Sequence, residues 1–196
     1  MEKIRKSVLL VLIVGLILCG CSGKAPEVIQ VPMDYKPTNT VVPPRDIKHT
    51  SIYFASFEDQ RKTLDQIGEN VENPKPVPAK ASPVEVISSL EKAFKREFDR
   101  AGFNLVEGPE KAERIIRVFL QNLWVQESST FQANVVARVE VSSKSGEVLA
   151  NEGFRGSASR WGSSYSPDQY RKVISDSYVE LLKGIFQNDA FMKKSF

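Results

Sequence analysis

The chain has 196 residues, including 27 Lys and Arg, 24 Asp and Glu, one His and two Cys. A chain of this length fits one domain with appendages, and it can bury a core without disulfide bonds. The formal net charge of +3 suggests a basic protein, and the two cysteines suggest a disulfide. The places of these residues in the sequence exclude both interpretations.

Residues 1–20 are predicted to be a removable export signal. They begin with a positively charged segment and continue with the apolar run VLLVLIVGLIL at residues 8–18. This run is too short to span a bilayer, which needs about 20 apolar residues. An uncleaved N-terminal anchor is the weaker alternative.

The run ends in Leu18-Cys19-Gly20-Cys21, which looks like a bacterial lipobox with Gly20 before the lipidated Cys21. Several acyl chains such as palmitate on Cys21 would hold the protein at a membrane permanently, since each buried CH₂ contributes about 0.8 kcal/mol. By resemblance to Gram-negative lipoproteins, Ser22 favours the outer membrane. The domain would then face the periplasm.

Removal of the signal leaves 24 basic and 23 acidic residues and a net charge of +1. Because Cys19 leaves with the signal and Cys21 carries lipid, no thiol remains for a disulfide, a metal site or a nucleophile. The balanced charge argues against nucleic-acid binding. His49 is the only histidine, and a metal site or a Ser-His triad needs further partners. We therefore expect no catalytic residue, no cofactor and no metal.

Residues 21–46 are predicted to be a lipidated tether, and residues 47–196 a single periplasmic domain. Residues 22–46 contain five of the eleven prolines and no sustained periodicity. Fully extended, such a segment reaches on the order of 80 Å. Residues 28–31 are an alternative edge strand within it.

Two amphipathic helices are predicted within the domain. The first begins at Ser82-Pro83 with a capping box and ends before Gly102. The second repeats this cap at Ser166, and its apolar residues recur at helical spacing over about four turns, residues 170–186.

Strand patterns occupy most of the remaining domain, and residues 58–81 between them are predicted to be a long polar loop. Strands or extended pieces are expected at 49–57, 103–106, 113–126, 132–142 and 147–161, with a hairpin turn around Gly146. Gly153 and Gly156 in the last strand indicate bulges or close approach of another backbone. The pattern predicts an α+β fold: an antiparallel-rich sheet of four to five strands with two amphipathic helices packed on one face.

An interaction surface is predicted from residues that commonly anchor protein interfaces, namely Arg, Trp and Tyr. The segment 155–165 carries four of them within a Gly/Ser-rich stretch, and a polar cluster follows the first strand. The candidate residues are Arg155, Arg160, Trp161, Tyr165, Asp59 and Arg61. The alternative is that Trp161 packs over the sheet end and the arginines are solvated. Trp124 is expected to pack in the core or at a strand end.

The sequence resembles the YajG-like outer-membrane lipoproteins over residues 47–192. The resemblance is carried by Asp59-Gln60-Arg61 with Ile67-Gly68, by LEKAFKREFDRAGFNLV at 90–106, and by the strand RIIRVFLQNLWVQ. The strand pair around SSKSGE and the closing amphipathic helix also fit. The resemblance implies a location and an architecture, and it implies no reaction.

These observations favour a non-enzymatic binding or scaffold module of the bacterial envelope, with an envelope protein as its partner. The alternative is an accessory lipoprotein of an envelope machine, such as a peptidoglycan synthase activator or a component of lipid or lipopolysaccharide transport. An enzyme is the third class, and its only candidate polar cluster is Glu58, Asp59 and Arg61.

Overall fold

The structure is a computed structural model that describes residues 25–41 and 50–196. The predicted export signal, Cys21 and His49 lie outside the described residues. Eight strands in one sheet and three α-helices are found in the described ranges. The strands are β1 (Ile29–Gln30), β2 (Ser51–Asp59), β3 (Gln66–Asn70), β4 (Val77–Lys80), β5 (Asn104–Leu105), β6 (Arg114–Glu127), β7 (Phe131–Ser143) and β8 (Val148–Arg160). The helices are α2 (Pro83–Arg100), α3 (Pro167–Gln187) and α4 (Asp189–Ser195).

The sheet is organised around β6, the longest strand. One edge of β6 pairs antiparallel with β7, which pairs antiparallel with β8. The other edge is shared by two parallel strands, because β2 pairs with Arg114–Leu120 and β3 with Val125–Glu127. The strands β5, β4 and β1 extend the sheet beyond β2 and β3. The α+β class and the central place of this strand are confirmed.

The expected sheet of four to five strands was too small, because the predicted loop at 58–81 contains β3 and β4. Each of these strands directs only a few apolar side chains inward, among them Ile67, Val77 and Ala79. So few alternating residues give a weak period-two signal. The sheet is also mixed, since β1, β2, β3 and β5 each form a parallel pair.

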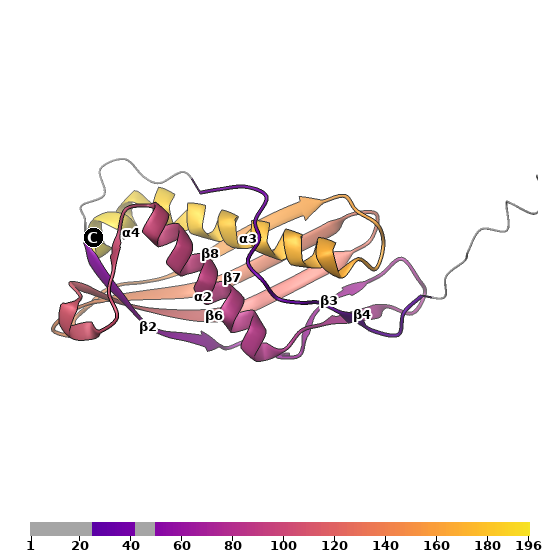
Figure 1. Cartoon of the computed structure of the whole chain (residues 1–196), viewed down its shortest axis with the longest axis horizontal. Helices are drawn as coiled ribbons and strands as arrows, with labels where there is room; N and C mark the ends of the chain where they lie inside the picture. Colours follow the sequence, from indigo (N-terminus) through magenta and orange to yellow (C-terminus); the bar gives the residue numbers. More distant parts are fainter. Residues whose placement is uncertain (1–24, 42–49) are drawn as a thin grey trace, which may run out of the picture.

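Both long helices lie on one face of the sheet, as predicted (Figure 1). Helix α2 packs on β2 and β5, whereas α3 packs on β7 and β8. The hydroxyl of Ser166 caps α3 by accepting a hydrogen bond from the amide of Gln169, but Ser82 forms no side-chain cap on α2. Helix α4, which was not predicted, packs against β8 through Phe191 and Phe154, with ring centroids 4.9 Å apart.

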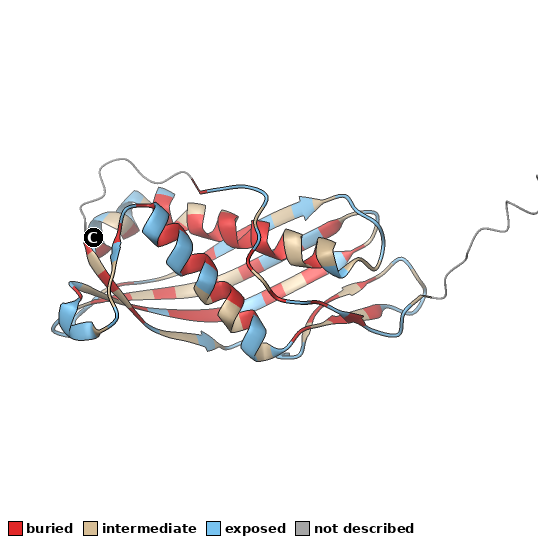
Figure 2. Ribbon diagram, in the orientation of Figure 1, coloured by how far each residue is buried: buried red, intermediate tan, exposed pale blue. Residues whose placement is uncertain are grey.

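The core lies between this helical layer and the inner face of the sheet, where the buried side chains face each other (Figure 2). Close packing of α3 on β8 depends on Gly156: a methyl group added there would overlap the Ser177 carbonyl oxygen and the Leu181 amide nitrogen. A methyl group added at Gly153 would meet no atom within 4 Å. Close approach of another backbone therefore explains the glycine at position 156 but not the one at position 153.

The segment expected to be a tether is partly folded onto the domain. Strand β1 pairs with β4, and the side chains of Ile29, Val31, Met33, Tyr35 and Val41 are buried in the core. Residues 31–41, called the strap below, cross α3 and approach α2 (Figure 1). The folded unit therefore includes residues 25–41. Within the described part of the chain, no helix combines the length and apolar character needed to cross a membrane.

Candidate interaction surface

The strap is fixed to α3 by two buried polar residues of that helix, Ser175 and Asp176. The Ser175 hydroxyl accepts a hydrogen bond from the amide of Lys36 at 3.1 Å. The Asp176 carboxylate accepts from the amide of Thr38 at 2.7 Å and from its hydroxyl at 2.8 Å. Because buried polar groups need partners, these contacts explain why two polar residues lie in the buried part of α3.

A single hydrogen bond joins the strap to α2. The hydroxyl of Tyr35 donates to Oε1 of Glu97, with 3.0 Å between the oxygens, and the Glu97 side chain is fully buried. Arg96 and Arg100 lie 3.8 and 3.6 Å from the same carboxylate oxygen. Burial, followed by the charge of Glu97, raises the pKa of Tyr35 far above its usual range. The phenol therefore stays protonated and remains a donor.

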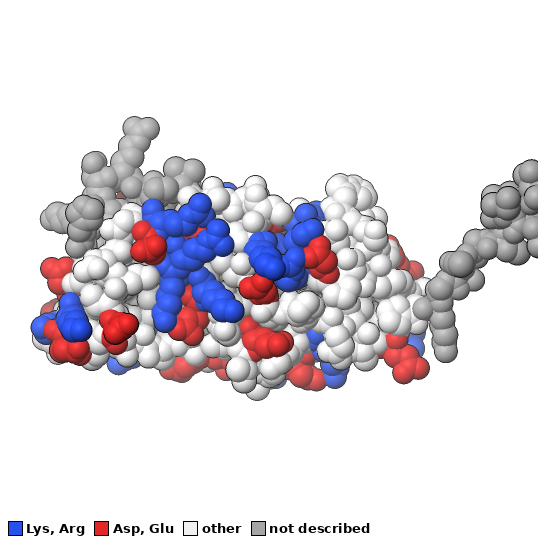
Figure 3. All heavy atoms as spheres, in the orientation of Figure 1, with Lys and Arg blue, Asp and Glu red and all other residues white. Residues whose placement is uncertain are grey.

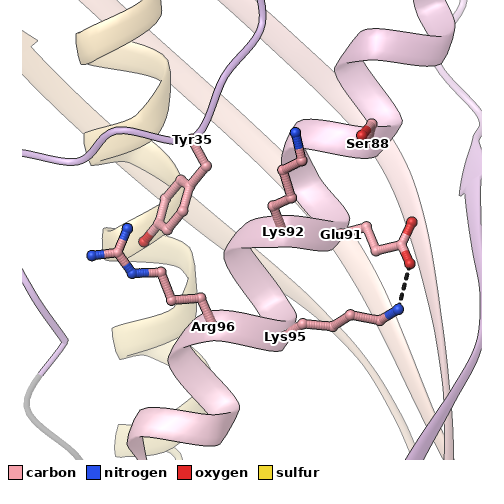
Figure 4. A pocket seen from close by; sticks show the side chains of 6 residues that line it. All are labelled: Tyr35, Ser88, Glu91, Lys92, Lys95 and Arg96. Carbon is pink, nitrogen blue, oxygen red and sulfur yellow. Dashed lines mark ion pairs between the residues drawn. The ribbon is translucent and has the colours of Figure 1, made fainter. Parts of the chain in front are cut away.

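An open groove of about 600 Å³ lies between the strap and the exposed side of α2. It is lined by Tyr35, Ser88, Glu91, Lys92, Lys95 and Arg96 (Figure 4). The guanidinium of Arg96 lies 5.7 Å from the centroid of the Tyr35 ring. Lys95 is paired with Glu91, whereas Arg96, which also lies 3.8 Å from Glu97, extends beside Tyr35 (Figure 4). Lys92 lines the same groove.

Basic residues form a stripe along the exposed side of the second half of α2 (Figure 3). This basic stripe consists of Lys92, Lys95, Arg96 and Arg100, all exposed. Cations near a helix C-terminus interact favourably with the helix dipole, which partly explains their placement. A stripe beside a groove also offers several donors to an anionic ligand, and arginine suits carboxylate or phosphate groups.

The predicted interface residues Asp59 and Arg61 form a buried ion pair instead of a free surface. The guanidinium donates to both carboxylate oxygens, with distances of 2.8 Å from Nε and 2.7 Å from Nη2. Nη2 also donates to the Leu64 carbonyl oxygen at 2.7 Å, and the Arg61 side chain is only 3% exposed. This pair stabilises the turn that follows β2. At this turn the strand paired with that edge of β6 changes from β2 to β3.

Arg160 and Tyr165 also have internal partners. Arg160 lies 3.2 Å from Asp176, one of the two residues of α3 that bind the strap. Tyr165 has a φ of +58°, and its amide donates to the buried Glu127 carboxylate at 2.7 Å. Its hydroxyl is hydrogen-bonded to the side-chain amide of Asn73. These contacts organise the segment that follows β8.

The remaining two predicted residues are exposed but lie on different parts of the surface. Trp161 follows β8 directly and is 76% exposed. Arg155 lies on the outer face of β8, opposite Val136 of β7. The structure thus brings Arg160, Trp161 and Tyr165 together in one region and separates them from Arg155 and from the Asp59–Arg61 pair.

The outer face of the sheet carries an ordered polar and aromatic network, since the described helices pack on the opposite face. The guanidinium of Arg138 lies 3.8 Å from the centroid of the Phe119 ring and donates to Asn151 at 3.1 Å. Arg117 pairs with Glu140 at 2.9 Å. Trp124, expected in the core or at a strand end, is half-buried and lines a cleft of about 320 Å³ beside Arg61.

No group of three or more His, Cys, Asp or Glu that could hold a metal ion is found in residues 25–41 and 50–196. No family model matches the sequence, and no curated protein matches it. The resemblance to YajG-like lipoproteins therefore stays a prediction.

Solved structures do match the fold. The chain is similar to protein XCC0632 from Xanthomonas campestris, assigned to DUF330, with a TM-score of 0.56 and 12% identity over 81% of this chain and 96% of that one. Lipoproteins are also among the matches. Lipoprotein GNA1162 from Neisseria meningitidis has a TM-score of 0.37 and 9% identity over 59% of this chain and 88% of that one. A minor lipoprotein from Acinetobacter baumannii has a TM-score of 0.38 and 9% identity over 72% and 92%. At 12% identity, the similarity to the Xanthomonas protein shows a shared fold only. The similarity to the two lipoproteins is too low to support a conclusion about this chain.

Sequence reasoning missed the groove because it treated the strap as a tether. A signal was present: Ile29, Val31, Met33 and Tyr35 are alternate apolar residues, the period of an extended chain that packs on one side. The sequence also contains the basic stripe, because Lys92, Lys95, Arg96 and Arg100 recur at the three- and four-residue spacing of one helix face. Only the fold shows that the strap lies beside it.

Proposed function

We propose that this chain is a lipid-anchored protein of the bacterial cell envelope and acts as a non-enzymatic binding or scaffold module. Its lipid is attached to Cys21, its domain faces the periplasm from the outer membrane, and the groove beside Tyr35 is its binding surface. The observation that carries the binding role is the basic stripe on α2, placed beside a groove whose second wall is fixed by the Tyr35–Glu97 hydrogen bond.

The chemistry of the groove favours an acidic partner. Arg96 and Lys92 present charge next to an aromatic ring, and Arg and Tyr are residue types that dominate binding energy at interfaces. The lipobox supports the anchor.

The anchor is tested by Cys21→Ser. We expect the variant to lack acyl groups and to leave the membrane fraction or to accumulate uncleaved, as mass spectrometry and fractionation would show. A mature, acylated protein made from the Cys21→Ser variant would contradict the assignment of Cys21.

The groove is tested by light-induced crosslinking in cells, with a photoreactive residue at Ser88 inside the groove. The matched position is Val84, which is 79% exposed on the same helix and does not line the groove. We expect an adduct from position 88 only, and we expect the double substitution Lys92→Glu with Arg96→Glu to remove it. An adduct that persists after this charge reversal would overturn the groove as an acidic-partner site. The exposed Lys62→Glu is the control for a change of charge elsewhere.

An accessory role in an envelope machine is the second candidate. The outer face of the sheet favours it, because Arg138 is held in place over the Phe119 ring and Trp124 is half-buried on the same face, and Arg and Trp are residue types that anchor protein interfaces. Mass spectrometry of the adducts separates the two roles. A single stoichiometric partner protein supports the accessory role, whereas adducts with envelope polymers or with many proteins support a general scaffold.

A further inference from the structure

Four segments meet at one end of the domain, which we call the loop end. The pairing register places them there: β1 runs parallel to β4, so the chain enters beside the β3–β4 turn, and β3 and β6 end together at Asn70 and Glu127. Phe131 and Arg160 are paired at the same level. The segments are the chain before β1 from residue 25, the turns at 71–76 and 128–130, and the loop at 161–166 (Figure 1, right).

Trp161 projects from this end on a loop that is held in place. Ser164 donates a hydrogen bond to Glu72 in the β3–β4 turn at 2.7 Å, and the amide of Tyr165 donates to Glu127 at 2.7 Å. On the other side of Trp161, Arg160 is paired with Asp176. Trp161 is nevertheless 76% exposed. The loop therefore presents a large apolar side chain to its surroundings in a fixed position.

We propose that the loop end faces the lipid surface in which Cys21 is anchored, with Trp161 in the headgroup region. This inference rests on the proposed lipid anchor. Three residues separate Cys21 from Ala25, and the four steps between these two positions span at most about 14 Å when extended. Strand β6 has 14 residues, so the opposite end of the sheet is about 45 Å away and out of reach of this short segment.

The chemistry of the loop end suits an interface with lipid better than one with a charged surface. Tryptophan is enriched at membrane–water boundaries, because its ring is apolar and its N–H remains solvated. The exposed charges at this end include Glu27, Glu72 and Lys75, so neither sign dominates. The right-hand part of the visible surface is mostly uncharged (Figure 3). Contact therefore depends on insertion of the indole and responds little to salt.

Tryptophan fluorescence in the reconstituted lipoprotein tests this orientation, because the chain has two tryptophans. The protein is purified from membranes and placed in vesicles of phosphatidylethanolamine and phosphatidylglycerol that contain shallow spin-labelled lipids. Trp124→Phe leaves Trp161 as the reporter, whereas Trp161→Phe leaves Trp124 on the outer sheet face as the matched control. We expect a blue-shifted Trp161 emission and several-fold stronger quenching of Trp161 than of Trp124, unchanged by salt.

The outcomes separate the inference from the proposed function. If mass spectrometry finds acylated protein on the vesicles but the two tryptophans are quenched equally, the orientation is wrong and the anchor stands. Quenching that depends strongly on salt would mean that charge attraction, and not insertion of the indole, holds the loop end at the lipid surface. That result would overturn the proposed role of Trp161. A mature protein without acyl groups would overturn the anchor, and the inference with it.

Discussion

The hydroxyl of Tyr35 and the carboxylate of Glu97 connect two segments that are 62 residues apart, through a buried hydrogen bond of 3.0 Å. Tyr35 belongs to the strap and Glu97 to α2, so this bond determines where the strap lies beside the basic stripe. The second carboxylate oxygen of Glu97 has no hydrogen-bond partner among the described residues. Glu97 is therefore held by the Tyr35 hydrogen bond together with the nearby guanidinium groups of Arg96 and Arg100.

Tyr35→Phe should lower the free energy of unfolding by about 1–3 kcal/mol, because it removes the hydrogen bond to a buried carboxylate that then keeps only its ion pairs with Arg96 and Arg100. Chemical denaturation measures this loss, and hydrogen exchange should show faster exchange in the strap. Tyr53→Phe is the control, since the Tyr53 side chain is half-buried on a different part of the sheet. Equal stability of the two variants would contradict the role of the Tyr35–Glu97 bond.

Asp176→Ala should also destabilise the protein, by about 2–3 kcal/mol, because it removes the acceptor for Thr38 and the partner of Arg160. Thermal and urea unfolding would measure the change. The comparison is Asp34→Asn, which removes a surface pair with Lys36 whose side chains are 45% and 65% exposed. Such pairs contribute about 0–1 kcal/mol. A similar loss in both variants would mean that Asp176 does not fasten the strap.

Asp59→Asn should reduce stability without a selective effect on binding, because the Asp59–Arg61 pair is buried. Removal of one partner of a buried pair costs about 3–5 kcal/mol. Glu91→Gln serves as the comparison, because it breaks the exposed i,i+4 pair with Lys95, which is worth about 0.3–0.5 kcal/mol. If the Asp59→Asn protein has normal stability but loses the crosslink, Asp59 belongs to the interaction surface after all.

Gly156→Ala and Gly153→Ala should differ sharply although both change the same strand. The methyl group at position 156 collides with the backbone of α3, so we expect a loss of about 1–3 kcal/mol or more in the free energy of unfolding, as for overpacked cores. The methyl group at position 153 meets no neighbour and should be tolerated. Melting temperatures of the two variants would test this prediction, and equal melting temperatures would refute close packing of α3 on β8.

Asp168 in the first turn of α3 should contribute to acid stability. Hydrogen bonds from Lys172 and then from Arg171 lower the pKa of Asp168 from 3.8 to about 2. Because this pKa is depressed in the folded state, the contribution is present above about pH 4 and is lost as the pH falls towards 2. Asp168→Asn should therefore weaken the pH dependence of stability in this window. An unchanged acid-unfolding profile would contradict the prediction.

The long, periodic elements could be predicted from the sequence. The Ser166 cap and a long apolar stripe predict helix α3. Strict alternation of buried and more exposed residues predicts β7. The short strands β3 and β4 could not be predicted, because they have only five and four residues and therefore little periodic signal. The parallel pairing of both β2 and β3 with one edge of β6 depends on long-range contacts that no local pattern encodes.

The candidate site was predicted less well, because residue type alone does not distinguish a free side chain from a paired one. Asp59 and Arg61 are two residues apart and form their ion pair with each other. Arg160 meets Asp176 only because α3 folds back over β8. Arg155 and Trp161 are the predicted residues that are exposed, and the 76% exposure of Trp161 excludes the alternative that it packs over the sheet end.

The strap also sets the order in which the fold can be completed. Thr38 and Asp176 are 138 residues apart, so this contact closes most of the chain into a loop. Contacts of such high sequence separation form late, because loop-closure entropy opposes them until the intervening structure exists. We expect the strap to remain open until α3 has formed. The strap contacts of Tyr35 and Thr38 would therefore be among the last to form, after α2 and α3 are in place.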